Sequence, residues 1–227
     1  MTRFTDELRS KAGEQWERVI HHRFTKELAA GTIDICVLKR YLVQDHRFLD
    51  SFSVLLASII AHLPTLKERI PGAQFLAVIT GPENTYFERS FEAMGISVEE
   101  RKATPDADVT TKFCTLMRTV AMEGTLAEML AVIVVCEWSY LSWGQAVQEQ
   151  ANRENFVCYE WVDLHSGPAF EGVVEYFRSN LDREGAKLDV AARASCEKRF
   201  LEAVQLEEEF FDYAYSGERS SSSTTSS

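Results

Sequence analysis

The chain has 227 residues and a formal net charge of −11 at pH 7, from 35 acidic and 24 basic side chains. So acidic a chain lacks the positive surface that drives binding to nucleic acids or anionic lipids, and we expect neither partner. Its five cysteines form no CxxC pair, which favours free thiols in a reducing compartment and therefore a cytoplasmic protein.

No segment of the sequence is typical of a signal peptide or a membrane-spanning helix. The N-terminal stretch MTRFTDELRSK is too highly charged for a signal peptide. The longest apolar run, Met129 to Cys136, is far shorter than the about 20 residues that a spanning helix needs. We therefore expect no association with a membrane.

Apolar residues recur at helical spacing along nearly the whole chain, and no alternating runs indicate strands, so the sequence predicts an all-α fold. Short loops marked by glycine and proline are typical of a helical bundle, here one domain over residues 1–217. The Ser/Thr-rich tail, 218–227, is expected to be disordered. Helices are expected at about 5–29 with a break near Gly13, 34–62, 72–94 with a kink or restart at Pro82, 107–123, 125–151, 157–165, 169–183 and 188–215.

An acidic residue falls on the apolar side of the second of these helices. In YLVQDHRFLDSF, the inner side is marked by Leu42, Phe48 and Phe52, and Asp45 lies on the same side. A carboxylate placed there costs several kcal/mol unless it is paired or hydrogen-bonded. Asp45 is therefore predicted to be either a structural partner or a functional group.

The central helix carries the polar stretch VVCEWSYLSWG. Cys136 and Tyr140 are four residues apart and share one face of this helix. They either line one cavity or belong to the core, since free cysteine and tyrosine are common core residues. Spacing alone favours the core.

Two further polar groups lie near aromatic residues toward the C-terminus. Trp161 and His165 are four apart in CYEWVDLHSG and share a face near a helix end, where a histidine is usually explained by capping. In LEEEFFDYAY, Glu207 falls on or beside the face of Phe210 and Phe211. A solvated run of glutamates fits this pattern as well.

The sequence has none of the common cofactor motifs. It contains no GxGxxG, GxxxxGK, GxSxG or HExxH motif and no paired ExxH motifs, so we expect no nucleotide, metal or other cofactor. What remains is a thiol, two carboxylates and several aromatic side chains. That set suits a pocket for a flat, nitrogen-rich ring, held by stacking and by hydrogen bonds to carboxylates.

Four blocks of sequence, in order, resemble the TenA family of thiaminase II enzymes: RYLVQD, CEWSYLSWG, YEWVDLH and EEEFFDYAY. The resemblance implies a heme-oxygenase-like helical bundle over most of the chain. It also implies a thiamine-salvage hydrolase that releases hydroxymethylpyrimidine from an aminomethyl aminopyrimidine, from thiamine, or from both. A non-catalytic protein of the same fold, binding thiamine or a pyrimidine or acting in regulation, is the alternative.

The resemblance assigns roles to individual residues. It implies that Cys136 is the nucleophile, Asp45 the carboxylate near that thiol, and Glu207 the carboxylate that contacts the pyrimidine. It places the chain in the cysteine-bearing branch of the family. Residues that would bind the substrate are Tyr140, Phe48, Phe113, His165 and Trp161.

The chain departs from the family pattern at three of these positions, Phe48, Phe113 and His165, where tyrosine is usual. Phenylalanine keeps the stacking surface and loses a hydroxyl, whereas histidine brings a group that titrates near neutrality. The choice between thiamine and aminopyrimidine therefore stays open. A homo-oligomer, tetramer or dimer, is also expected, because exposed aromatic side chains on such a bundle are usually hidden between subunits.

Overall fold

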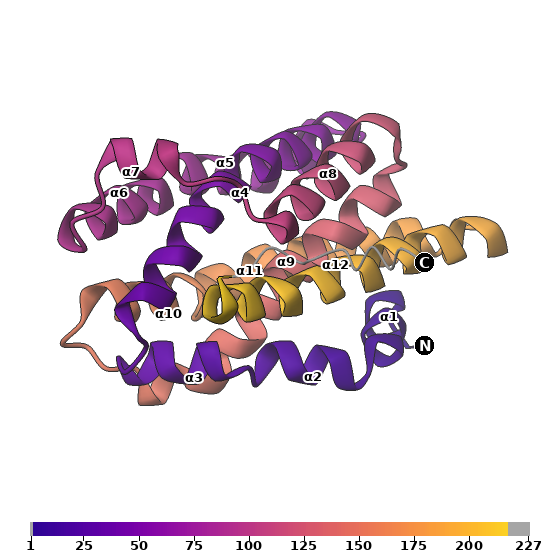
Figure 1. Cartoon of the computed structure of the whole chain (residues 1–227). Coiled ribbons are helices and arrows are strands. Elements are labelled where there is room, and N and C mark those ends of the chain that lie inside the picture. Colours follow the sequence, from indigo (N-terminus) through magenta and orange to yellow (C-terminus); the bar gives the residue numbers. More distant parts are fainter. Residues whose placement is uncertain (1, 218–227) are drawn as a thin grey trace, which may run out of the picture.

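Residues 2–217 are described by a computed structural model, and throughout this range the regular elements are helices. Figure 1 shows them gathered into one bundle around a central helix. The predicted all-α fold is confirmed. The elements are α1 (Phe4–Ala12), α2 (Glu14–Ile20), α3 (Arg23–Ala30), α4 (Ile35–His62), α5 (Leu66–Val78), the π-helical turn η1 (Ile79–Glu83), α6 (Asn84–Ala93), α7 (Val98–Ala103), α8 (Asp108–Glu123), α9 (Leu126–Val147), the 3-10 turn η2 (Gln148–Gln150), α10 (Phe156–Leu164), α11 (Pro168–Gly185) and α12 (Val190–Ser216).

The helices differ from the predicted ones mainly in the first half of the chain. The expected helix over 5–29 is three helices, with the predicted break at Gly13 and a second break at His21 and His22. That second break was missed because the residue that caps the start of α3 is a histidine. The Nδ1 atom of His22 accepts a hydrogen bond from the backbone N–H of Phe24 at 3.1 Å. The short helix α7, which begins with a capping box at Ser97, was also missed.

The segment around Pro82 is neither a kink nor a restart of an ordinary helix. α5 begins six residues earlier than predicted, at Leu66, and passes through Pro71 into η1, which contains Pro82. A π-helical turn is wider than an α-helical one and is found mostly as a single turn inserted between α-helical segments, as it is here between α5 and α6. The turn changes which side chains face the interior.

The central helix of the bundle is α9. It begins at the predicted capping box, in which the Glu128 carboxylate accepts from the Thr125 backbone N–H at 2.8 Å. It packs against α2, α4, α11 and α12. Leu126–Gln150 is long and apolar enough to cross a membrane, but 78% of its most apolar stretch is buried inside the bundle, as expected of a core helix.

A buried glutamine fixes the start of α8 against α4. Gln44 donates to the Pro105 carbonyl at 3.0 Å, and its side-chain oxygen accepts from the Ala107 N–H at 3.0 Å and the Thr110 hydroxyl at 2.7 Å. In the block RYLVQD, the glutamine is therefore structural. It sets the position of α8 beside the aspartate that comes after it in the sequence.

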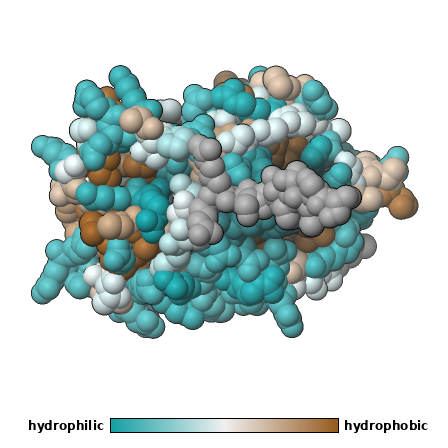
Figure 2. Space-filling model, in the orientation of Figure 1, coloured by the Kyte–Doolittle hydropathy of each residue, from teal (hydrophilic) through white to brown (hydrophobic). Residues whose placement is uncertain are grey.

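The surface is mainly hydrophilic, and Figure 2 shows separate apolar patches on one face. Among residues 2–217, the exposed large apolar side chains are aliphatic ones, such as Leu66, Met122 and Val190. The exposed aromatic residues on which we based the expected oligomer are therefore absent from the described part of the chain, and the oligomer stays a prediction. All five cysteines are free, as expected. The predicted tail, 218–227, lies outside the described residues.

Candidate functional site

All eight residues predicted to form the site line one cavity inside the bundle. The cavity has an empty volume of about 490 Å³, including its opening. The predicted residues on its wall are Asp45, Phe48, Phe113, Cys136, Tyr140, Trp161, His165 and Glu207, and the wall is completed by Leu49, Phe52, Ile79, Glu83, Glu137 and Phe210.

Cys136 lies in the middle of α9, away from the positive end of that helix. Its side chain is 4% exposed. Burial raises the pKa of the Cys136 thiol well above its ordinary value, and the nearby Glu207 and Glu137 carboxylates raise it further. The thiol is thus protonated in the empty site, and it needs a neighbouring base before it can act as a nucleophile.

Glu207 on α12 is the carboxylate that acts most strongly on this thiol. Burial raises the pKa of Glu207 well above its ordinary value, the charge of Asp45 raises it further, and a hydrogen bond with the Cys136 thiol acts in the opposite direction. The resemblance implied that Asp45 is the carboxylate near the thiol. Asp45 lines the same cavity as the thiol, and its charge raises the pKa values of Glu207 and Glu83.

Asp45 projects from α4 into the cavity, as its helical position predicted. Its side chain is 6% exposed, and its Oδ2 atom has no hydrogen-bond partner among residues 2–217. Burial raises the pKa of Asp45 to about 7, against a smaller lowering by the Tyr41 hydroxyl. A buried carboxylate oxygen without a protein donor is suited to accept a hydrogen bond from a ligand.

Two further carboxylates in the cavity, Glu83 and Glu137, were missed. Burial raises the pKa of Glu83 to about 8, with Asp45 adding to the shift. Burial raises the pKa of Glu137 well above its ordinary value, with Glu83 and then Glu207 adding to the shift. A signal for Glu137 was present: it comes directly after Cys136 in a helix that is apolar on nearly every side. Glu83 comes after Pro82 in GPEN, which is typical of an exposed turn, and no sequence signal indicates the π-helical turn that buries it.

Tyr140 is held in place by a buried hydrogen-bond chain. Its hydroxyl lies 2.7 Å from the Tyr41 hydroxyl, which accepts a hydrogen bond from Trp161 Nε1 at 3.2 Å. The chain ties α9, α4 and α10 together at the wall of the cavity. Cys136 and Tyr140 therefore share the cavity face that their spacing allowed.

His165 both ends α10 and lies on the cavity wall. It ends α10, and its Nδ1 lies 2.8 Å from the Trp161 carbonyl oxygen. Its ring also lies on the cavity wall, with its centroid 4.8 Å from that of Tyr140. Burial lowers the pKa of His165 to about 4, so the imidazole is neutral at physiological pH.

Aromatic rings form the apolar part of the wall. The rings of Phe48 and Phe113 meet edge to face with centroids 5.0 Å apart, and Phe210 lies 6.4 Å from Phe48. Such rings supply a flat contact surface for a planar ligand without adding a hydrogen-bonding group. The hydroxyls that tyrosine would bring at Phe48 and Phe113 are absent from this wall.

The polar part of the wall is strongly biased toward acceptors of hydrogen bonds. Four carboxyl groups line the cavity, whereas no lysine or arginine of the described chain does. Within residues 2–217, no group of three or more His, Cys, Asp or Glu side chains is arranged to hold a metal ion. A cavity with buried carboxyls, aromatic walls and a thiol suits a flat ring that carries several N–H donors or a positive charge.

Comparisons with known proteins agree with this geometry. The sequence profile of the TENA/THI-4/PQQC family matches residues 9–217. An aminopyrimidine aminohydrolase from Halalkalibacterium halodurans is 26% identical over 213 residues, covering 93% of this chain and 95% of the relative. A protein of the same name from Bacillus subtilis is 26% identical, covering 94% and 90%. The solved structure of a TenA homologue from Pyrococcus furiosus superposes with a TM-score of 0.84 at 22% identity, covering 93% and 100%, which confirms the expected heme-oxygenase-like fold.

Proposed function

Because the chain belongs to the TENA/THI-4/PQQC family, we propose that it is a thiamine-salvage hydrolase that cleaves an aminopyrimidine at the methylene beside the ring. The relatives named aminopyrimidine aminohydrolases support this activity. The observation that carries the proposal is the meeting of Cys136, Glu207 and Asp45 in one aromatic-walled cavity. The substrates are an aminomethyl aminopyrimidine, with an amine as leaving group, and thiamine, with a thiazolium.

A pyrimidine accepts a nucleophile poorly unless its ring nitrogen is protonated. Glu207 holds a proton in the empty site, because burial and the charge of Asp45 raise its pKa. In the proposed reaction Glu207 gives this proton to the ring nitrogen and, now a carboxylate, takes the proton of the adjacent Cys136 thiol. One carboxyl group thus activates both the electrophile and the nucleophile, while Asp45 accepts a hydrogen bond from the exocyclic amine of the ring.

The Cys136 thiolate then forms a bond to a ring carbon, and the ring nitrogen holds the displaced electron pair as N–H. Return of that pair breaks the bond from the methylene to the leaving group, which departs with its electrons. Water adds to the exposed methylene and releases one proton to solvent, and the carbon–sulfur bond breaks to restore the aromatic ring. The departing thiolate takes its proton back from Glu207, and the ring nitrogen then returns its proton to Glu207. The sum is substrate and water giving hydroxymethylpyrimidine and the free amine or thiazole, with the cysteine regenerated.

Substitution of the nucleophile tests this proposal. Wild-type protein is incubated separately with thiamine and with the aminomethyl aminopyrimidine, and hydroxymethylpyrimidine is measured beside Cys136→Ser and the control Cys114→Ser. Cys114 is half-buried on α8 and lies outside the cavity. We expect Cys136→Ser to lose at least about 100-fold in kcat and Cys114→Ser to keep its activity. Equal activity of Cys136→Ser and wild type would disprove the nucleophile.

The alternative is a non-catalytic binding protein of the same fold. It predicts tight binding of the pyrimidine without turnover of either compound, and a Cys136→Ser variant that binds as well as wild type. The raised pKa of Glu207 beside a thiol favours the enzyme, because a binding site has no use for a proton donor placed against a nucleophile.

A further inference from the structure

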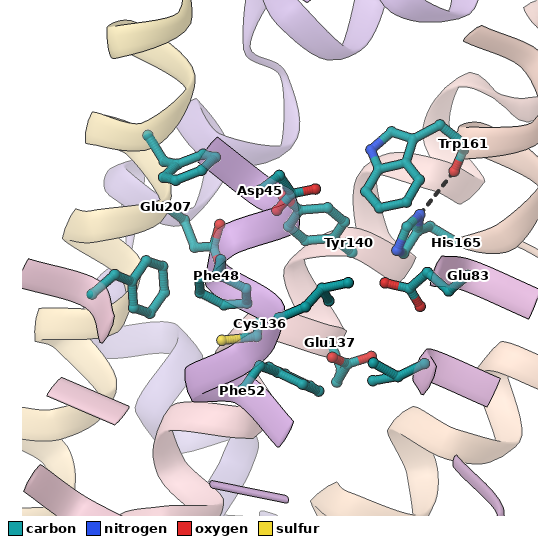
Figure 3. A pocket seen from close by; sticks show the side chains of 14 residues that line it. Asp45, Phe48, Phe52, Glu83, Cys136, Glu137, Tyr140, Trp161, His165 and Glu207 are labelled. Atoms are coloured by element: carbon teal, nitrogen blue, oxygen red, sulfur yellow. Dashed lines mark hydrogen bonds between the residues drawn. The ribbon is translucent and has the colours of Figure 1, made fainter. Parts of the chain in front are cut away.

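The cavity has two chemically different ends. Figure 3 shows Cys136, Phe48 and Glu207 on one side of the view, Glu83 and His165 on the other, and Glu137 between the two groups. The reaction proposed above uses the first end, which holds the ring, the nucleophile and the proton donor. The second end therefore faces the substituent that leaves.

The two carboxylates of this second end have no partner of their own. Glu83 is 9% exposed and Glu137 is 7% exposed, and both line the cavity. Within the described range 2–217, no hydrogen bond or positive charge offsets their burial, and each lies near enough to another carboxylate to have its pKa raised further. Buried acids are almost always paired, so two unpaired ones that face a cavity indicate a ligand that pairs with them.

The histidine beside them presents an acceptor as well. The bond from its Nδ1 to the Trp161 carbonyl, at 2.8 Å, requires the ring proton to be on Nδ1, since a carbonyl only accepts. With a pKa of about 4, His165 carries no second proton at neutral pH. Its Nε2 is then a free acceptor on the cavity wall, with no hydrogen-bond partner among the described residues.

A cation in the subsite makes Glu83 and Glu137 release their protons, and the two carboxylates and the neutral imidazole nitrogen then provide acceptors and no donor. An alkylammonium group matches them, because it has a positive charge and three N–H donors. A thiazolium ring has the charge but no N–H to donate. We infer that Glu83, Glu137 and His165 form a subsite that binds the amino group of the aminomethyl substrate as an ammonium ion and selects it over the thiazolium of thiamine.

The assignment of this subsite to the leaving group rests on the proposed function. When the bond from the methylene to nitrogen breaks, its electron pair stays on nitrogen, so the ammonium group departs as neutral ammonia without taking a further proton. The hydroxyl oxygen of the product comes from water. The subsite binds the product alcohol less well than the substrate, because the alcohol carries no charge.

The first test is a binding measurement that does not depend on turnover. The aminomethyl and hydroxymethyl pyrimidines differ only in the group that the subsite would hold, and both are titrated by calorimetry into Cys136→Ser protein. We expect the aminomethyl compound to bind at least about tenfold tighter. Adding Glu83→Gln and Glu137→Gln should reduce that preference to less than about threefold.

Matched controls remove the same charge at the surface. Glu92 on α6 and Glu149 in η2 are exposed and lie outside the cavity. Glu92→Gln and Glu149→Gln, made together in the Cys136→Ser protein, should keep the full preference for the amine. The subsite is overturned if the protein that also carries Glu83→Gln and Glu137→Gln prefers the amine as strongly as the Cys136→Ser protein does. It is also overturned if the Cys136→Ser protein itself shows no preference for the amine.

A kinetic split tests the selectivity and separates this inference from the proposed function. With Cys136 present, Glu137→Gln should lower kcat/KM at least about tenfold for the aminomethyl compound and less than about threefold for thiamine. Equal losses for both substrates overturn the subsite but leave the hydrolase intact. A protein that hydrolyses neither compound yet keeps the amine preference in calorimetry refutes the hydrolase and supports the subsite.

Discussion

Gly144 on α9 lies directly against the backbone of His165 at the end of α10. A Cβ atom added at Gly144 would overlap the carbonyl oxygen of His165 and stand 2.9 Å from its carbonyl carbon. The absence of a side chain at Gly144 therefore lets α10 end close to α9. Gly144 lies one turn of α9 after Tyr140. The contact therefore brings the His165 ring to the cavity wall beside the Tyr140 ring.

Gly144→Ala should displace His165 and weaken both the fold and the site. Overpacking of this kind costs about 1–3 kcal/mol in the free energy of unfolding. Because the His165 ring must move, kcat/KM for the aminomethyl compound should fall as well. Denaturant unfolding and steady-state kinetics measure the two effects.

Gly172 on α11 is the control, since a Cβ atom there meets nothing within 4 Å, and Gly172→Ala should be neutral or slightly stabilising. Matching behaviour of the two variants would contradict the role given to Gly144.

The stability of the ligand-free protein should fall as the pH rises from about 6.5 to 8. Asp45 and Glu83 have pKa values of about 7 and about 8, raised by burial, so the folded state keeps protons that the unfolded state has released. The free energy of unfolding should fall by about 1.4 kcal/mol per pH unit for each carboxyl group that is protonated in the folded state and ionised in the unfolded state. His165, with a pKa of about 4, acts in the opposite direction only below this range. Denaturant unfolding at several pH values measures the slope, and a flat or rising profile would refute it.

Replacing the two glutamates of the amine subsite should stabilise the empty protein. Glu83→Gln with Glu137→Gln keeps the side-chain size and removes two buried groups that repel each other when ionised. We expect Tm to rise at pH 8, by about 2–4 °C for each kcal/mol gained, and to change little at pH 5, where the carboxyls are protonated. Thermal unfolding monitored by circular dichroism measures this. The exposed pair Glu92→Gln and Glu149→Gln should leave Tm unchanged, and an equal rise in that pair would point to net charge as the cause.

Loss of the Tyr41 hydroxyl should loosen the far wall of the cavity. Tyr41→Phe leaves the Trp161 indole N–H and the Tyr140 hydroxyl without their buried partner. A buried polar group left without a partner costs about 1–3 kcal/mol, so the free energy of unfolding should fall by that amount. KM should rise because Tyr140 is no longer fixed. Tyr213→Phe on α12 serves as the control, since the Tyr213 hydroxyl has no hydrogen-bond partner within residues 2–217. A Tyr41→Phe protein as stable as this control would show that the chain of hydroxyls contributes nothing.

Helical spacing predicted which residues share a face, and the structure places those residues together. Asp45 lies inside because Leu42 and Phe52, on the same side of α4, are buried in the core. Glu207, for which a solvated position fitted as well, is buried for the same reason, because Phe210 and Phe211 turn that side of α12 to the core. What spacing alone did not decide was whether Cys136 and Tyr140 face a cavity. That depends on helices distant in the sequence, and the family resemblance supplied it.

The two missed glutamates differ in how far the sequence could have indicated them. Glu137 lies beside the face that Cys136 and Tyr140 share, and spacing singled out only that face, although α9 is buried on nearly every side and offers a charged residue no exposed position. Glu83 was unpredictable in a stricter sense. Its direction depends on the wide turn η1, and a proline next to a glycine in the sequence is the usual sign of a surface loop.

The turn η1 also makes one part of the cavity separately adjustable. A π-helical turn holds one residue more than an α-helical turn, and removing one residue from a helix rotates the later residues by about 100°. A deletion of a single codon within 79–83 would therefore turn Glu83 away from the cavity, while Asp45, Cys136 and Glu207 stay on three other helices. The preference for one leaving group over another can thus be gained or lost in one genetic step, with the reacting groups untouched.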